Sequence, residues 1–393
     1  MKNKLVKTLA ATLCLSAVLT AGSAPAFAED AETAVSEEVS TEETTAEETD
    51  AAAEEAAPAE AAEATTEDAA AAETEEATAD AEKTAAETEE SAADTEEAAP
   101  AEEAAEEYED TGEAPEAPGI VYEPNVSETP KEQAILVVSF GTSFNESRAE
   151  TICNIENTIA RAYPDYDVRR AFTAQTIIDK LAKRDNVLID NVEQALDRAI
   201  DDGVTTLIVQ PTHLMNGLEY DDLEATLAEY ADALDISLAA PLLTTDDDFT
   251  KVAEAITAAT KEYDDGQTAI CFMGHGTEAP SNAIYEKMQS VLKDAGYANY
   301  YVGTVEAEPS LDDVIAAVKE GDYKKVVLEP LMVVAGDHAN NDMAGDEDGS
   351  WKTTFEAEGY EVECILRGLG SMNDIDALYV SHVQEAIDLL SAE

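Results

Sequence analysis

The chain has 393 residues with 88 acidic and 22 basic side chains, so its formal net charge is −66 at pH 7. This balance argues against nucleic acid as a partner, because the chain has no basic stripe to neutralise phosphates. Composition divides the sequence into a short apolar start (residues 1–28), a long acidic stretch (29–118) and a remainder that contains apolar, polar and charged residues together.

Residues 1–28 have the pattern of a secretory signal peptide. Lys2, Lys4 and Lys7 precede an apolar run, and the small-residue motif "AFA" ends at Ala28. The run is short and rich in Ala and Thr, which favours a cleaved signal peptide over a transmembrane helix. An uncleaved membrane anchor is the alternative interpretation. We therefore expect an exported protein, periplasmic or extracellular at the cell envelope, with no stable membrane span after cleavage.

Residues 29–118 are predicted to form a disordered acidic spacer. They contain 35 acidic residues and one basic residue, Lys83, within a background of Ala, Glu and Thr. Such a segment cannot bury enough apolar surface to offset the loss of chain entropy on folding. A solvated tether is the main interpretation, and a polyanion that gathers metal ions is the alternative.

The remaining residues alternate short apolar runs with amphipathic helical patterns, which predicts an α/β fold with parallel sheets. Residues 131–265 are expected to form an N-terminal half, residues 266–372 a C-terminal half, and residues 373–393 a closing helix. Three cysteines, an odd number, fall in this part and are expected to be free thiols. The predicted strands are 134–140, 166–172, 205–210, 236–240, 268–273, 300–305, 324–331 and 361–366.

The two halves repeat each other weakly. "ILVVSFGTS" (135–143) is similar to "AICFMGHGTEA" (269–279), and "TLIVQPTHLMNG" (206–217) is similar to "KVVLEPLMVVAGDH" (325–338). Two similar Rossmann-like halves that face each other across a central cleft are the predicted architecture. Ligands of open α/β sheets bind outside the carboxyl ends of the strands, so polar residues at those ends are the candidates.

Two strand ends of the N-terminal half carry candidate residues. Ser139, Gly141 and Thr142 lie in "SFGTS", where a turn and a helix cap would already explain the glycine and the threonine. His213 and Glu219 flank the Asn-Gly turn of the second motif. Packing of the histidine and a helix-dipole interaction of the glutamate are the structural alternatives to a role in the cleft.

Three strand ends of the C-terminal half carry His275, Glu306 and His338. His275 stands between two glycines that leave its ring accessible. Glu306 directly follows a strand, where a carboxylate is costly to bury unless it is paired or metal-bound. His338 is followed by several aspartates, Asp342 among them. Two imidazoles and a carboxylate suit a divalent first-row transition metal, although no local metal motif is present.

At these residues the chain resembles the anaerobic cobalt chelatase family, CbiK type (sirohydrochlorin cobaltochelatase). The matching segments are "ILVVSFGTS", "RAFTAQTIIDKLAKRD", "NGLEYDDL", "FMGHG", "VGTVEAEP", "PLMVVAGDHANNDMAGDEDGSWK" and "GLG". The resemblance runs from about residue 134 to residue 390. The apolar start and the acidic stretch lie outside it, which indicates an exported form with an acidic N-terminal extension.

The resemblance implies a class II chelatase fold and insertion of Co²⁺ into sirohydrochlorin without ATP, a step of anaerobic cobalamin biosynthesis. It places the metal ligands on His275, Glu306 and His338. His275 is also our candidate for the general base, with Glu219 across the cleft to guide the ion or accept a second proton. Binding of the tetrapyrrole is assigned to Ser139, Gly141, Thr142, His213 and Arg170.

Two other functions fit the same residues. Export would also suit a non-catalytic protein that binds haem, another tetrapyrrole or a metal. A Fe²⁺ or Ni²⁺ chelatase on this scaffold is the third alternative, because ligand types alone do not separate these ions from Co²⁺. The sequence does not define the oligomeric state, and a homo-oligomer is compatible with it.

Overall fold

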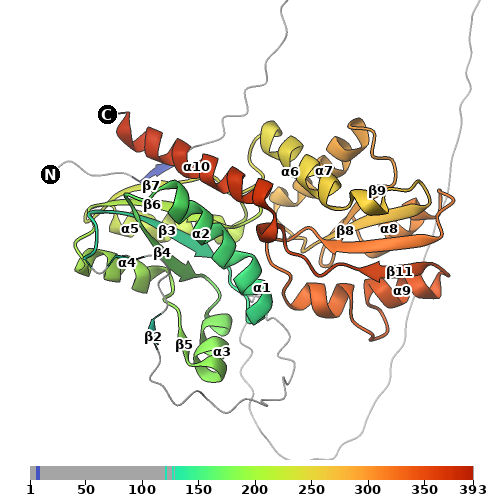
Figure 1. Ribbon diagram of the computed structural model, residues 1–393, viewed down its shortest axis with the longest axis horizontal. Helices are drawn as coiled ribbons and strands as arrows, with labels where there is room; N and C mark the ends of the chain where they lie inside the picture. The colour runs from blue at the N-terminus through green and yellow to red at the C-terminus, as the bar shows by residue number, and fades with distance from the viewer. Residues whose placement is uncertain (1–5, 9–119, 122–125, 128, 393) are drawn as a thin grey trace, which may run out of the picture. The chain divides into compact units, whose positions relative to one another are not determined.

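The computed structural model describes residues 6–8, 120–121, 126–127 and 129–392. All of them belong to one compact unit (Figure 1). The predicted acidic spacer and most of the predicted signal peptide lie outside the described residues.

The first half is built on a parallel sheet with the strand order β1-β7-β6-β3-β4. A separate two-stranded parallel ladder joins β2 and β5. The strands are β1 (Lys7–Thr8), β2 (Ile120–Val121), β3 (Gln133–Ser139), β4 (Asp167–Phe172), β5 (Val187–Leu188), β6 (Thr206–Pro211) and β7 (Asp235–Leu238).

The second half is built on a parallel sheet with the order β11-β10-β8-β9. Its strands are β8 (Thr268–Gly274), β9 (Tyr300–Thr304), β10 (Lys325–Pro330) and β11 (Glu361–Cys364). β8 is an inner strand with β9 on one side and β10 on the other, so the segments that follow these three strands leave the sheet at neighbouring positions.

Helices connect the parallel strands in both halves, as crossover connections require. The helices are α1 (Asn145–Glu150), α2 (Ile152–Ala162), α3 (Gln175–Asp185), α4 (Val192–Asp201), α5 (Leu218–Tyr230), α6 (Asp246–Ala259), α7 (Ala283–Asp294), α8 (Leu311–Val318), α9 (Trp351–Ala357) and α10 (Asn373–Ser391). Shorter helical turns are η1 (Lys261–Tyr263), η2 (Pro280–Asn282), η3 (Ala339–Met343, a π-helical turn) and η4 (Leu369–Ser371).

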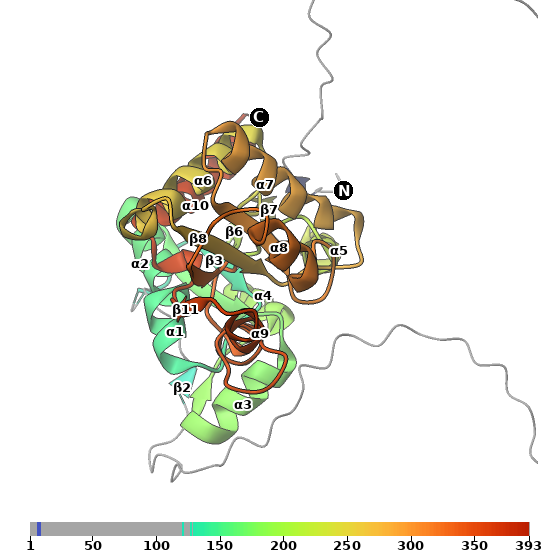
Figure 2. The same cartoon turned by 90° about the vertical axis from the view of Figure 1, so that its right-hand side faces the viewer.

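Side chains of each central strand point alternately into two different cores. In β3, Ile135 and Val137 face a core shared with α2, α6 and α10, whereas Leu136 and Val138 face α4 and α5. β8 alternates in the same way between α6 and α7 on one face and α8 and α9 on the other. Figure 2 shows α6 and α7 above the strands of the second half and α9 below them.

One continuous core joins the two halves. It includes apolar side chains of β3 and β6 from the first sheet, β8 and β10 from the second, and α6, α7 and α10. Although α10 is the last element of the chain, it packs against α2, β6 and β7 of the first half (Figure 1). The closing helix therefore ties the end of the second half back to the first half, which limits how far the two sheets can separate.

The predicted arrangement of two parallel α/β halves is confirmed, and all eight predicted strands are present within a few residues of their predicted bounds. Cys153, Cys271 and Cys364 are free, and burial raises the pKa of the Cys271 thiol well above its usual range. The sequence did not indicate β1, which extends the first sheet with Lys7 and Thr8 from the predicted signal peptide. Within the described residues, no helix is long and apolar enough to cross a membrane.

A buried carboxyl group near the start of α10 makes the stability of the fold depend on pH. Asp376 is 1% exposed; its Oδ2 accepts hydrogen bonds from Asn154 and Thr158, and its Oδ1 has no hydrogen-bond partner among the described residues. Burial raises the pKa of Asp376 to about 7. The folded protein thus holds a proton that the unfolded chain releases near pH 4, so the stability of the fold decreases as the pH rises from about 4 to about 7.

We expect Asp376→Asn to be more stable than the wild type at pH 8, because a neutral amide carries no buried charge. Its advantage in Tm should shrink toward pH 5, where the wild-type carboxyl is already protonated. Thermal unfolding across this pH range measures the effect, and Asp374→Asn, which removes an exposed charge from the same helical turn, is the matched control. A gain in Tm that is equal at every pH, or equal to that of the control, would contradict the assignment.

Candidate metal centre

The metal candidates of the second half meet because three adjacent strands end at the same level. In the ladder, Gly274 of β8 pairs with Thr304 of β9, and Met273 pairs with Pro330, the last residue of β10. His275 therefore leaves the sheet between the segments that carry Glu306 and His338. Strand order and register thus bring His275 and Glu306 together and start the His338 segment beside them.

Two glycines give His275 its position. A Cβ on Gly274 would lie 2.1 Å from the ring of Tyr285, so only glycine lets that ring pack under the end of the strand. Gly276 has a φ of +91°, and a Cβ there would lie 2.8 Å from the backbone nitrogen of Ala307. The backbone can thus turn sharply directly after His275 and approach the loop that follows β9.

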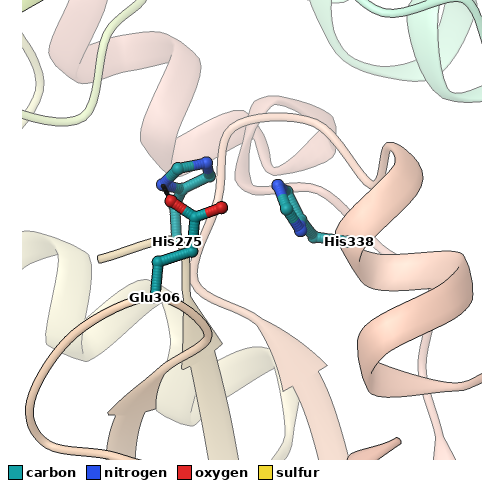
Figure 3. Close-up of side chains that lie close together, drawn as sticks. All are labelled: His275, Glu306 and His338. Carbon is teal, nitrogen blue, oxygen red and sulfur yellow. Dashed lines mark ion pairs between the residues drawn. The ribbon is translucent and has the colours of Figure 1, made fainter. Parts of the chain in front are cut away.

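Backbone hydrogen bonds fix Glu306 beside His275. The amide of Glu306 donates to the carbonyl of His275 at 2.9 Å, and the amide of Val305 donates to Gly274 at 3.0 Å. The loop then closes on itself through Thr304, whose hydroxyl donates to the carbonyl of Ala307. The backbone of Glu306 is therefore fixed beside His275, and its side chain points from there toward the two histidines (Figure 3).

His338 lies further from its strand and depends on contacts with other segments. The segment after β10 is paired with the "GLG" turn, since Leu369 and Gly370 donate to the carbonyls of Met332 and Val333. A Cβ on Gly368 would lie 2.5 Å from the Val333 oxygen, so glycine is needed for this approach. The amide of Ala335 donates to Ser147 of the first half. His338 then immediately precedes the π-helical turn η3 as its N-cap residue.

The three side chains point toward one another (Figure 3). One nitrogen or oxygen atom from each of His275, Glu306 and His338 lies within 4.8 Å of the other two. The two rings meet edge to face, with centroids 4.7 Å apart and an interplanar angle of 88°, and His275 Nδ1 lies 3.8 Å from Glu306 Oε2. Close to half of the His275 and Glu306 side chains remains exposed. The cluster can therefore bind a cation and leave coordination positions open.

The partners of Nδ1 define the tautomer of both rings. His275 Nδ1 lies 2.8 Å from the Gly276 carbonyl, and His338 Nδ1 lies 2.7 Å from Asp342 Oδ2. A carbonyl oxygen and an ionised carboxylate only accept hydrogen bonds, so both Nδ1 atoms carry the proton. The Nε2 atom of each ring then keeps its lone pair, which can bind a metal ion or accept a proton.

The first half contributes Glu219 and His213 to the same region. Thr173 donates to Glu219 Oε2 at 2.7 Å, and His213 Nε2 lies 3.7 Å from that oxygen. Burial alone would raise the pKa of Glu219, but His213 and Thr173 lower it below its ordinary value, and a positive charge on His275 lowers it further. Glu219 and His275 are therefore close enough to interact electrostatically from opposite halves when His275 carries a proton on both ring nitrogens. Neither ring nitrogen of His213 has a hydrogen-bond partner among the described residues.

The remaining strand-end candidates of the first half are mostly buried. Ser139 accepts a hydrogen bond from Thr212, and Thr142 accepts one from the amide of Phe144. Gly141 has a φ of +104° and packs so tightly on Phe172 that a Cβ would lie 2.5 Å from its ring. These contacts account for all three residues structurally, and binding of a ligand by them stays a prediction.

Arg170 does not fit the predicted role in substrate binding. Its guanidinium is buried, with Nε 2.6 Å from Glu156 Oε1, a second contact to Glu156 Oε2, and NH2 3.1 Å from the sulfur of Cys153. A charge removed from water needs such a partner. The pair leaves Arg170 buried among protein groups, with no surface open to a ligand.

Three residues near the site were not predicted to have a role. Thr173 holds Glu219, Asp342 holds His338, and the ring of Phe140 is 42% exposed directly after β3. The sequence repeat contained a signal for Phe140, because "FGT" aligns with "HGT" and gives Phe140 the position in the first half that His275 has in the second. The other two contacts depend on side-chain geometry that no sequence pattern records.

We expect Arg170→Met to lose about 3–5 kcal/mol of stability, because it leaves the Glu156 carboxylate buried without a partner. The double variant Arg170→Met/Glu156→Leu should regain most of this loss. Urea unfolding of the two variants and the wild type measures both effects, with Arg161→Met as an exposed control. A double variant no more stable than Arg170→Met would contradict the structural role of the pair.

The chain is similar to known cobalt chelatases. The cobalt chelatase (CbiK) family matches residues 133–388. The sirohydrochlorin cobaltochelatase of Salmonella typhimurium is 34% identical over 263 residues, which cover 67% of this chain and 99% of that protein. The sirohydrochlorin cobaltochelatase CbiKC of Nitratidesulfovibrio vulgaris is 29% identical over 262 residues, with 66% and 92% covered.

Two solved structures are also similar. SirB from Bacillus subtilis with Fe³⁺ has a TM-score of 0.46 and 14% identity, and covers 65% of this chain and 95% of its own. CbiX, described as the terminal enzyme of siroheme biosynthesis in denitrifying bacteria, has a TM-score of 0.42 and 17% identity, with 65% and 99% covered. The family match spans more than half of the sequence and includes His275, Glu306 and His338. The chain belongs to the cobalt chelatase (CbiK) family.

Proposed function

We propose that this protein is a sirohydrochlorin cobaltochelatase that inserts Co²⁺ into the macrocycle without ATP. The observation that carries the proposal is the cluster of His275, Glu306 and His338, whose ligand atoms lie within 4.8 Å of one another. Family membership and two relatives named sirohydrochlorin cobaltochelatase support the same activity.

The donor set suits temporary binding of the ion. Two imidazole nitrogens and one carboxylate bind first-row divalent metals well, whereas a closed four-ligand site would retain them. The exposed fraction of His275 and Glu306 leaves room for a macrocycle nitrogen to replace a protein ligand. Co²⁺ is the substrate metal in this proposal, and a few weak ligands favour its release.

Metal insertion displaces two pyrrolic protons, which need acceptors. Because Nδ1 of His275 donates to the Gly276 carbonyl, Nε2 is its remaining basic atom. The same lone pair can bind Co²⁺ first and accept a proton after the ion has moved to the macrocycle. A neutral imidazole is well suited to this exchange near pH 7. His275 thus acts as ligand and general base in succession for one of the two protons. The second proton leaves to water at the exposed side of the site.

Glu219 is better suited to attract the cation than to keep a proton. Its lowered pKa favours the ionised form at neutral pH, and ionised carboxylates of low pKa are weak bases. The negative charge faces His275 from the other half of the molecule. It therefore lowers the energy of a divalent ion that enters between the halves.

We expect the purified full-length protein to accelerate insertion of Co²⁺ into sirohydrochlorin in the absence of ATP, followed by the absorbance change of the macrocycle. His275→Ala should reduce the rate by roughly 10²–10⁴-fold, the range that a positioned general base contributes. His382→Ala is a matched control, since His382 is a buried histidine that contacts Asp248 instead of the cluster.

The outcomes separate the competing functions. A rate equal to the spontaneous reaction, unchanged by His275→Ala, would favour an exported protein that binds haem, another tetrapyrrole or metal without catalysis. A higher kcat/KM for Fe²⁺ or Ni²⁺ than for Co²⁺ at equal free-ion concentration would favour a chelatase for those metals.

We also propose that the protein is exported and loses its first 28 residues. The basic start, the apolar run and the small residues before position 29 support this processing. Mass spectrometry of the protein from its native host should find Glu29 as the mature N-terminus. Cleavage would remove β1, which lies within the first 28 residues. An intact Met1 or Lys2 terminus on the mature protein would contradict cleavage, and β1 would then stay paired with β7.

A further inference from the structure

We propose that Asp342 is the positioning residue of the metal centre: it fixes the ring of His338 so that Nε2, and not Nδ1, faces the incoming ion. This inference rests on the proposed chelatase function only for the identity of the metal. The contact that carries it is the 2.7 Å hydrogen bond between His338 Nδ1 and Asp342 Oδ2.

The π-helical turn brings the two side chains together. His338 immediately precedes η3, and Asp342 is the fourth residue after it, within the turn. The amide of Ala344 reaches back five residues to the carbonyl of Ala339, which defines the wider turn. Asn340 closes the start of the turn by donating to the carbonyl of Gly336. The backbone that carries both members of the pair is therefore tied down before any ion binds.

The charges around Asp342 leave its carboxylate available to the histidine. Asp346 of the same loop is paired with Lys352, and Asp337 accepts from Asn341. Asp342 forms no ion pair with a lysine or arginine within the described part of the chain. It contacts His338 instead, whose side chain is only 24% exposed. The interaction is thus partly shielded from water.

The two histidines of the centre have different partners on Nδ1. His275 donates to a neutral carbonyl, and His338 donates to a carboxylate. A carboxylate that accepts from the distal nitrogen fixes the ring orientation and makes the other nitrogen a stronger metal ligand. We therefore assign His338 the longer-lasting bond to the ion, and His275 the bond that breaks when its nitrogen takes a proton.

Co²⁺ binding without a tetrapyrrole tests the assignment apart from catalysis. Co²⁺ is titrated into the full-length protein and followed by its visible absorption, which reports imidazole ligation. Asp342→Ala should weaken binding by about 10- to 100-fold, the usual effect of losing such a partner. Asp342→Asn, whose amide oxygen can still accept from Nδ1, should lie between this variant and the wild type. Asp348→Asn removes an equal charge from the same exposed loop and should bind like the wild type.

Nitrogen NMR of the metal-free protein supplies the second measurement. The chain has four histidines, so ¹⁵N-labelled imidazoles give few signals, and His338→Ala identifies the one of interest. The wild type and Asp348→Asn should show His338 protonated on Nδ1, whereas Asp342→Ala should show a mixture with the Nε2–H tautomer. A role of Asp342 in folding alone would not produce this change.

The proposal would be overturned if Asp342→Ala kept both the wild-type tautomer of His338 and the wild-type affinity for Co²⁺. Equal weakening by Asp348→Asn would also overturn it, because the loss would then reflect the total charge of the loop. Failure of the wild type to metallate sirohydrochlorin, with Co²⁺ binding that still depends on Asp342, would refute the proposed chelatase activity and leave this inference intact.

Discussion

The metal centre depends on the register between β8 and its two neighbours. Gly274 pairs with Thr304 and Met273 with Pro330, so all three strands end at one level of the sheet. Side chains alternate along a strand with a period of two, and a slip of one residue would move them to the opposite face. The same slip would separate Glu306 from the His275 carbonyl that binds its amide. The apolar alternation of β8 between two cores fixes the register and therefore also fixes the site.

The positions of His275 and Glu306 could be predicted because each directly follows a strand. The position of His338 could not, since seven residues separate it from the end of β10 and their path depends on contacts with "GLG", Ser147 and the core around Phe172. The strand-end pattern and the family resemblance nevertheless both grouped His338 with His275 and Glu306. Arg170 was assigned to tetrapyrrole binding because the sequence does not reveal that Glu156 lies beside it in the core and takes up its charge.

The centre combines rigid placement with incomplete coordination. Backbone hydrogen bonds hold the loops that carry the three ligands. Gly276 and Gly368 let neighbouring loops pack closer together than a side chain at either position would allow. The three ligands nevertheless leave positions open, and the site is partly exposed. A metal carrier needs this combination, because preorganised ligands capture the ion at little cost in entropy, whereas a fourth protein ligand would oppose its transfer. Under the proposed function, the protein binds Co²⁺ well enough to orient it and weakly enough to lose it to four macrocycle nitrogens.

The two halves share a backbone turn after equivalent strands, but the cluster of candidate metal ligands lies in the second half. Gly141 and Gly276 follow equivalent strands with φ values of +104° and +91°, so the chain makes the same turn in each half. The residue before the turn is His275 in the second half and Phe140 in the first. The second half therefore carries the cluster of metal ligands, whereas the first half carries a partly exposed aromatic ring at the equivalent position and contributes Glu219, which Thr173 holds. The repeat has kept one backbone turn and placed the metal-binding cluster in the second half.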